Sequence, residues 1–176
     1  MIGPSIDFIS MTKLIISINM FFASFLVFGL PDSLESYLIE QCREVGILVP
    51  VARAILFQEN RGCNPNACPF NKDGSQDLGL FQLNSNYLWK DFVPNYWDRE
   101  DEFRWADPFH STYIAVRHIK WLYDVYKGPS MPTMQSRTFM VALAYNCGVG
   151  AVLKGKVPEA SVKYAVSVVY SVWGVK

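Results

Sequence analysis

The apolar residues of this chain recur at the spacing of an α-helix, and this periodicity constrains its fold more than any other feature. The clearest case is the segment 109–126, which is followed by the strong helix-stopping pair Gly128–Pro129. Its apolar stripe consists of Ala115, Ile119, Leu122 and Tyr126. Signals for β-strands are weak throughout the chain. We therefore predict a mainly α fold.

Four further helices are predicted from the same periodicity and from the turn residues at their ends. They cover residues 34–45, 50–60, 133–146 and 159–173. Pro50 suits the first turn of the second helix, where its missing N–H costs nothing. The last helix is apolar nearly all round, which predicts that it is buried. A glycine-containing turn, 148–157, precedes it.

A long segment between the second helix and the segment 109–126 is rich in turn-forming residues. Residues 61–78 are mostly Gly, Asn, Pro, Asp and Ser, a composition that favours turns over regular structure. Long ordered loops tend to carry function. We expect one domain of about five to seven helices with this irregular loop inside it.

Length and charge bound the class of protein. The 176 residues suit one domain, and their 51% hydrophobic content is ample for one packed core. Sixteen basic and sixteen acidic residues leave no net charge, so the balance does not suggest a nucleic-acid partner. We expect a monomer.

The N-terminal segment has the layout of a secretory signal peptide. Residues 14–30 carry no charged side chain and follow Lys13 closely. Val27 and Gly29 are small enough for the positions before a signal-peptidase cut, so we expect 1–29 to be removed. An uncleaved membrane anchor is the alternative, since this apolar run is near the lower limit for a membrane span. Either way, 30–176 is expected outside the cytoplasm, in the periplasm or cell envelope.

The cysteines fit an exported domain. There are four, namely Cys42, Cys63, Cys68 and Cys147. An oxidising compartment permits two disulfides among them, and Cys63–Cys68 is the expected pair because it closes a short loop. A metal site is not expected, because the two histidines, His110 and His118, are not beside that pair. The chain also lacks a Gly-rich phosphate loop, so we predict no cofactor.

Glu59 stands on the apolar face of the predicted second helix. It continues the i, i+3, i+4 series of Ala52, Ile55 and Leu56 at i+7. Partial burial would raise the pKa of this carboxyl group, so that it could donate a proton near neutral pH. That is the role of the general acid in glycosidic bond cleavage. The alternative is that Glu59 ends the helix and pairs with Arg61.

Three motifs in order carry a resemblance to a known family. Residues 59–67 read ENRGCNPNA, 79–85 read GLFQLNS, and 142–150 read ALAYNCGVG. They resemble the catalytic segments of the soluble lytic transglycosylases, lysozyme-like enzymes of glycoside hydrolase family 23. In that family a Glu closes a helix, an Asn-Pro turn follows, and a Gly-hydrophobic-hydrophobic-Gln motif lines the sugar groove.

The resemblance spans about residues 36 to 172 and implies a lysozyme-like fold. Asp107-Pro108 is similar to the family's Asp-Pro-x-x-Asn helix start, and Tyr164 with Val166 and Val169 resembles its closing Tyr-Val pattern. The chain departs from the family at Asn60, where Ser is common, and at Cys147, where Ala is usual. The Cys-flanked loop 63–68 is also unusual.

The resemblance implies Glu59 as catalytic acid and base and six substrate-contacting residues: Asn60, Gln82, Asn84, Tyr145, Asn146 and Tyr164. Spacing places Asn146 on a helix face with Phe139 and Ala142, which calls for a buried polar partner. For Tyr145 and Asn146 the alternative is a helix end leading into Gly148. For Asn84 it is a turn residue.

The implied reaction is non-hydrolytic cleavage of the β-1,4 bond between N-acetylmuramic acid and N-acetylglucosamine of peptidoglycan glycan strands. It yields 1,6-anhydro ends and needs one carboxyl group, Glu59. A hydrolytic muramidase would need a second acidic group, for which Asp77 is the candidate; otherwise Asp77 is a solvated loop residue. The third reading is an inactive peptidoglycan-binding scaffold, against which the presence of Glu59, Tyr145 and Asn146 argues.

Overall fold

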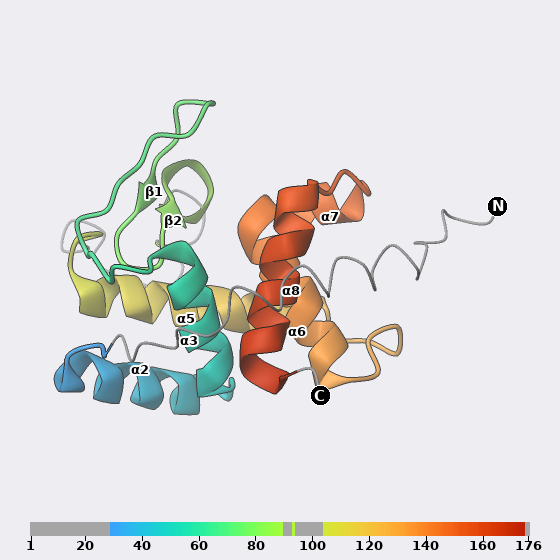
Figure 1. Ribbon diagram of the computed structural model, residues 1–176, viewed down its shortest axis with the longest axis horizontal. Coiled ribbons are helices and arrows are strands. Elements are labelled where there is room, and N and C mark those ends of the chain that lie inside the picture. Colours follow the sequence, from blue (N-terminus) through green and yellow to red (C-terminus); the bar gives the residue numbers. More distant parts are fainter. Residues whose placement is uncertain (1–28, 90–92, 94–103, 175–176) are drawn as a thin grey trace.

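The computed structural model describes residues 29–89, 93 and 104–174, and these form a mainly helical domain (Figure 1). The predicted leader, 1–29, therefore lies almost wholly outside the described residues. The helices of the described part are α2 (Asp32–Val45), α3 (Val49–Glu59), the π-helical turn η1 (Ser85–Trp89), α5 (Pro108–Val125), α6 (Met134–Cys147), α7 (Val149–Leu153) and α8 (Glu159–Trp173). The predicted mainly α fold is confirmed.

Local signals explain where the helices begin and end. Asp107 caps α5, because its side chain accepts hydrogen bonds from the backbone N–H groups of Phe109 and His110 at 2.8 and 3.3 Å. Helix α6 begins with a capping box between Thr133 and Ser136. Helix α2 ends at Gly46, whose φ of 75° is a left-handed conformation that favours glycine.

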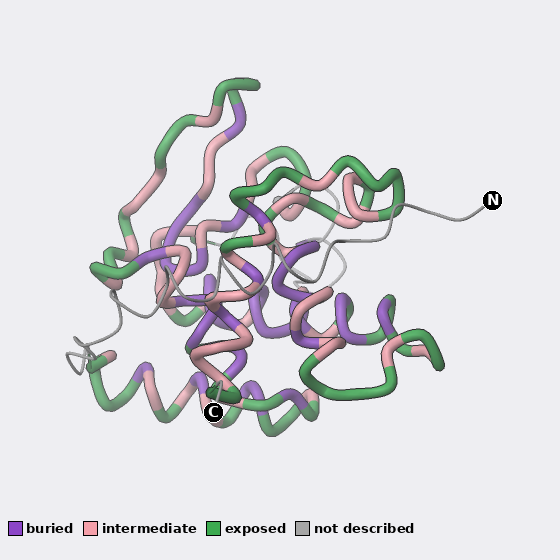
Figure 2. The backbone as a smooth tube through the Cα atoms, turned by 45° about the vertical axis from the view of Figure 1, so that its right-hand side comes forward, coloured by how far each residue is buried: buried purple, intermediate pink, exposed green. Residues whose placement is uncertain are grey.

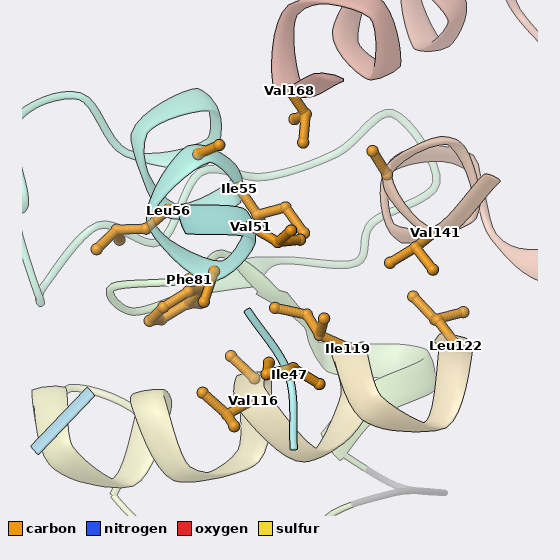
Figure 3. Close-up of a cluster of buried hydrophobic side chains, with 14 of the residues drawn as sticks. Ile47, Val51, Ile55, Leu56, Phe81, Val116, Ile119, Leu122, Val141 and Val168 are labelled. Atoms are coloured by element: carbon orange, nitrogen blue, oxygen red, sulfur yellow. The ribbon is translucent and has the colours of Figure 1, made fainter. Parts of the chain in front are cut away.

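The core gathers around α3. Val51, Ala52 and Ile55 of this helix are completely buried. Figure 3 shows Val51 and Ile55 facing side chains that come from the other elements, among them Ile119 of α5 and Val168 of α8. Helix α8 packs on both α3 and α6, and α5 packs on α2 and α6. One face of α3 is thus covered by other elements, and this packing determines the position of its last residue, Glu59.

A short β-hairpin follows the irregular loop. Strands β1 (Asp77–Leu78) and β2 (Leu83–Asn84) are antiparallel, with Asp77 opposite Asn84. Residues 60–76 project beyond the helices in Figure 1, and Figure 2 shows most of them exposed or half-buried. An isolated bridge between Phe70 and Gln76 pairs the two sides of this projection.

Two sequence-based expectations about helices are corrected. Helix α8 is not buried all round: only Ser161, Ala165 and Val168 are buried, because a single face of small residues packs on α3 and α6. The predicted turn 148–157 contains the short helix α7, which α6 precedes directly. Among the described residues, none of the helices has the length and apolar character needed to cross a membrane.

The expected disulfide is not formed in the structure. All four cysteines are free thiols, Cys42 being buried and the others partly buried. The loop is closed by hydrogen bonds instead: the Asn60 side chain donates to the Asn64 carbonyl at 2.7 Å and accepts from its N–H at 3.1 Å. The Ala67 N–H donates to the same carbonyl at 3.2 Å.

Candidate active site

Glu59 is the last residue of α3, and it is half-buried at the point where that helix meets α8. The buried residues Ala52, Ile55 and Leu56 of the same face direct it toward the interior. The structure therefore places the carboxyl group on the apolar side of the helix, as its spacing predicts.

Tyr164 of α8 fixes one oxygen of this carboxyl group. Its hydroxyl donates a hydrogen bond of 2.6 Å to Glu59 Oε1, across 105 positions of the chain. Because Oε1 accepts this bond, the proton of the acid belongs on the other oxygen, Oε2. The contact orients the carboxyl group and leaves one oxygen for a reacting partner.

The surroundings of Glu59 favour its protonated form. Burial raises the pKa of Glu59 from an ordinary 4.5 to about 7, the hydrogen bond from Tyr164 opposes this rise, and the negative charge of Asp77 adds to it. Near neutral pH the group is then present both as acid and as carboxylate. A single residue with this pKa can donate a proton and later accept one.

Asp77 lies in β1 and is half-buried. The side chain of Asn84 on β2 donates to Asp77 Oδ1 at 3.0 Å. The charge of Asp77 raises the pKa of both Glu59 and Tyr145, which places it near both groups. The hairpin thus brings Asp77 close enough to influence Glu59, and its role as a second carboxylate stays a prediction.

Tyr145 of α6 lies near Glu59 and is uncharged near neutral pH. Its hydroxyl donates to the carbonyl of Phe81 at 2.9 Å, and its ring lies 5.4 Å from that of His118. Burial, followed by the charges of Glu59 and Asp77, holds the pKa of Tyr145 well above its ordinary value. Burial also lowers the pKa of His118 to about 3, so neither ring is charged near neutral pH.

Residues 79–82, the motif GLFQ, form a tight turn, and the side chain of Gln82 links this turn to the preceding loop by hydrogen bonds. Gly79 has a φ of 71°, and a Cβ atom there would lie 2.3 Å from the carbonyl oxygen of Trp105. The Gln82 side-chain amide donates to the carbonyls of Gly79 at 2.7 Å and Ala67 at 3.3 Å. Its NH₂ group is thus engaged within the protein, and the predicted contact of Gln82 with sugar stays a prediction.

Three other residues are predicted to contact substrate, and their roles stay predictions. Asn60 is 8% exposed and is tied to Asn64 through both ends of its amide, so it closes the loop. Asn84 donates to Asp77 and Ser75. Asn146 is exposed, not buried against a polar partner, because it lies in the last turn of α6, beyond the buried part of that helix.

Ser75 is a residue of this site that the sequence did not single out. It is 2% exposed, and its hydroxyl accepts from Asn71 and Asn84 and donates to Asp73. Its position two residues before Asp77 was the available signal, since alternate residues of an extended segment share a face. Within the described ranges, no cluster of His, Cys, Asp and Glu could hold a metal ion.

A mainly helical domain with a half-buried acid at a helix end, bonded to a tyrosine of another helix and influenced by a carboxylate of a short β-hairpin, is typical of the lysozyme-like class. The comparison with protein-family models agrees: the model described as "Transglycosylase SLT domain" matches residues 36–168. The chain therefore belongs to the transglycosylase SLT domain family. Comparisons with curated proteins and with solved structures gave no match.

Proposed function

We propose that the chain is a peptidoglycan lytic transglycosylase and that Glu59 is its catalytic acid and base. The observation that carries the proposal is the half-buried Glu59 carboxyl group, oriented by Tyr164 and with a pKa raised to about 7. Family membership supports peptidoglycan as the substrate. The glycosidic bond cut is the β-1,4 link between N-acetylmuramic acid and N-acetylglucosamine.

In the first step Glu59 Oε2 donates its proton to the glycosidic oxygen as the bond from that oxygen to the anomeric carbon breaks. The substrate's own N-acetyl carbonyl stabilises the positive charge that develops at this carbon. In the second step the 6-hydroxyl of the same N-acetylmuramic acid attacks its anomeric carbon and gives its proton to the Glu59 carboxylate. No water is consumed, and the acid is regenerated in its starting form.

A hydrolytic muramidase is the second candidate, and the position of Asp77 favours it. A carboxylate beside the acid can position or activate a water molecule on the sugar. Asp77 is held toward the site by Asn84 and influences the pKa of Glu59. The two candidates share the first proton transfer and differ in what attacks the anomeric carbon.

Product masses separate the candidates. The chain from Leu30 onward is incubated with purified peptidoglycan, and the released muropeptides are weighed. Products lighter by one water and without a reducing end support the transglycosylase, whereas hydrated reducing ends support the muramidase. Binding of glycan without any release would overturn both and leave the scaffold reading.

Glu59→Gln is expected to reduce turnover by about a thousandfold while the protein stays folded, since the amide cannot donate the required proton. Turnover is measured from released muropeptides, and folding from the circular dichroism spectrum. Tyr87→Phe is the control, because Tyr87 is 66% exposed. Undiminished turnover by Glu59→Gln would contradict the assignment.

We also propose that the domain works outside the cytoplasm. The apolar run 14–30 after Lys13 supports export. Leu30, the first residue after the expected cut, already packs partly against the core, so cleavage at Gly29 would leave the described domain intact. The mass of the protein recovered from the periplasm tests this: retention of residues 1–29 would indicate an anchor.

A further inference from the structure

A row of hydrogen-bonded polar side chains leads along the projecting loop and hairpin to Asp77. Asn71 Nδ2 donates to Ser75 Oγ at 3.1 Å, and Ser75 Oγ donates to Asp73 Oδ1 at 2.7 Å. Asn84 Nδ2 donates both to Ser75 Oγ and to Asp77 Oδ1, at 3.0 Å each. The row therefore ends on the carboxylate beside Glu59.

Backbone geometry brings these side chains to one face. Ser75 and Asp77 are two residues apart in an extended segment, so both point to the same side. Asn84 lies opposite Asp77 in the β1–β2 pair, and this places the Asn84 amide within reach of both Ser75 and Asp77. The Asn84 amide thus spans Ser75 and Asp77.

The direction of each hydrogen bond is determined. The Ser75 hydroxyl gives its single hydrogen to Asp73, so toward Asn71 and Asn84 it can only accept. One hydrogen of the Asn84 amide is then used on Ser75, and the other is directed to Asp77. Ser75 is 2% exposed, so water does not compete for this arrangement.

The Asn84 amide has little left to offer a sugar. Both of its hydrogens are donated within the protein, and its Oδ1 accepts from the Asn86 backbone N–H at 3.0 Å. A side chain that contacts substrate would keep a donor or acceptor free. Its contacts instead converge on Asp77.

We propose that Asn84 is a positioning residue that holds the Asp77 carboxylate beside Glu59, with Ser75 fixing the direction of its amide. The inference rests on the proposed function, because it assigns Asn84 to the reaction that Glu59 performs. Held in place, the charge of Asp77 favours the protonated form of Glu59.

Other groups facing Glu59 do not supply this effect. Among the described residues, those that act on its titration are Tyr164 from α8 and Asp77 from β1, while Tyr145 from α6 responds to its charge. The two tyrosines are neutral near pH 7, and the Tyr164 hydrogen bond favours the ionised acid. Loss of the Asp77 position should therefore make Glu59 a stronger acid.

The test follows Glu59 directly by NMR titration of protein labelled with ¹³C at the Glu carboxyl groups. In Asn84→Ala the Glu59 midpoint is expected to move down by about half a unit, which lowers the ratio of protonated to ionised acid about threefold at pH 7. The kcat at pH 7 should fall about twofold, because the protonated fraction of Glu59 falls from about one half to about one quarter, and it should recover at lower pH with KM unchanged.

A second background tests whether Asn84 acts through Asp77. Asp77→Asn removes the charge and should itself lower the Glu59 midpoint. Adding Asn84→Ala to Asp77→Asn should then change the midpoint no further, since coupled residues are not additive. A further drop of the same size in the double variant would overturn the proposal.

Two more variants test the role of Ser75 and provide a control. Ser75→Ala removes the acceptor that directs Asn84 and should lower the midpoint in the same direction, by less. Asn86→Ala is the matched control, because only its backbone contacts Asn84 and its side chain is exposed. A Glu59 midpoint unchanged in both Asn84→Ala and Ser75→Ala overturns the positioning role, whereas a wild-type protein that cuts no peptidoglycan overturns the proposed function instead.

Discussion

Two opposing influences act on the Glu59 carboxyl group. Burial and the charge of Asp77 favour its protonated form, while the hydroxyl of Tyr164 donates to the carboxylate and favours ionisation. The balance leaves the pKa near 7, where both forms are populated. A reaction in which the same group gives and then recovers a proton needs this balance.

A raised pKa makes the folded protein less stable at high pH. Below the ordinary pKa of 4.5 both folded and unfolded chains hold the Glu59 proton; between 4.5 and about 7 the unfolded chain loses it first, so the free energy of unfolding falls. Glu59→Gln should therefore be more stable than wild type at pH 8, by at most about 3 kcal/mol, and equal to it near pH 4. Urea unfolding at both pH values measures this.

Glu159→Gln is the control for that measurement. Glu159 pairs with Lys163 on the surface, and this partner lowers the pKa of Glu159. A group with a lowered pKa adds stability above its unfolded pKa, so its removal should bring no gain at pH 8. A gain equal to that of Glu59→Gln would mean that burial of Glu59 is not the cause.

Tyr164→Phe should shift the pH profile of activity upward. The variant loses the hydrogen bond that stabilises the ionised carboxyl group, so the pKa of Glu59 should rise and the basic limb should move to higher pH. Loss of orientation should lower turnover at its optimum about tenfold. Muropeptide release between pH 5 and 9 measures both effects, and a basic limb that moves downward would contradict the assignment of Tyr164.

At the scale of elements, the turn that joins β1 to β2 depends on one glycine. Gly79 combines a positive φ with a close approach to the Trp105 carbonyl, just before α5 begins. The Phe81 N–H also donates to the buried Ser111 hydroxyl of α5 at 3.2 Å. The turn thus packs against the start of α5, and these contacts hold the hairpin that carries Asp77.

Gly79→Ala should destabilise the protein by about 3 kcal/mol or more, because the added Cβ atom would overlap a backbone oxygen in addition to straining φ. Gly74→Ala is the matched control: Gly74 also has a positive φ, of 82°, but no atom lies within 4 Å of an added Cβ. It should cost about 1 kcal/mol. Thermal unfolding compares them, and equal losses would show that the contact with Trp105 does not matter.

At the scale of the whole molecule, a buried arginine joins α2 to α5. Arg117 of α5 is 8% exposed and donates to Gln41 at 2.7 Å and to Glu44 at 2.9 Å, both on α2. Its guanidinium carbon lies 3.4 Å from the centre of the Tyr113 ring. This cluster connects two helices that are about 70 residues apart in the chain.

Arg117→Ala should lower the free energy of unfolding by about 3 kcal/mol, because it leaves the buried Gln41 unpaired and removes a desolvated charge partner. Lys120→Ala, which breaks an exposed pair with Asp124 on the same helix, should cost under about 1 kcal/mol. Chemical denaturation compares the two. Similar losses would indicate that the Arg117 cluster adds nothing beyond a surface ion pair.

The sequence by itself predicted the helices and singled out Glu59 as the candidate acid. Helix periodicity, Pro50 and the Gly128–Pro129 pair are local signals, and with them each long helix was predicted to within about two residues. The i+7 position of Glu59 likewise predicted its apolar side. These features depend on neighbours within one or two turns, which the chain order already specifies.

Only the tertiary structure decided which groups meet Glu59. Tyr164 reaches it from α8, Asp77 is brought to it by the hairpin, and the amide of Asn84 is used on Asp77 and Ser75. Periodicity specifies which face of an element is apolar, but it leaves open which polar groups from distant segments come within hydrogen-bond distance. The burial of a helix is likewise decided by tertiary packing. Helix α8 is apolar nearly all round, but only the face that packs on α3 and α6 is buried.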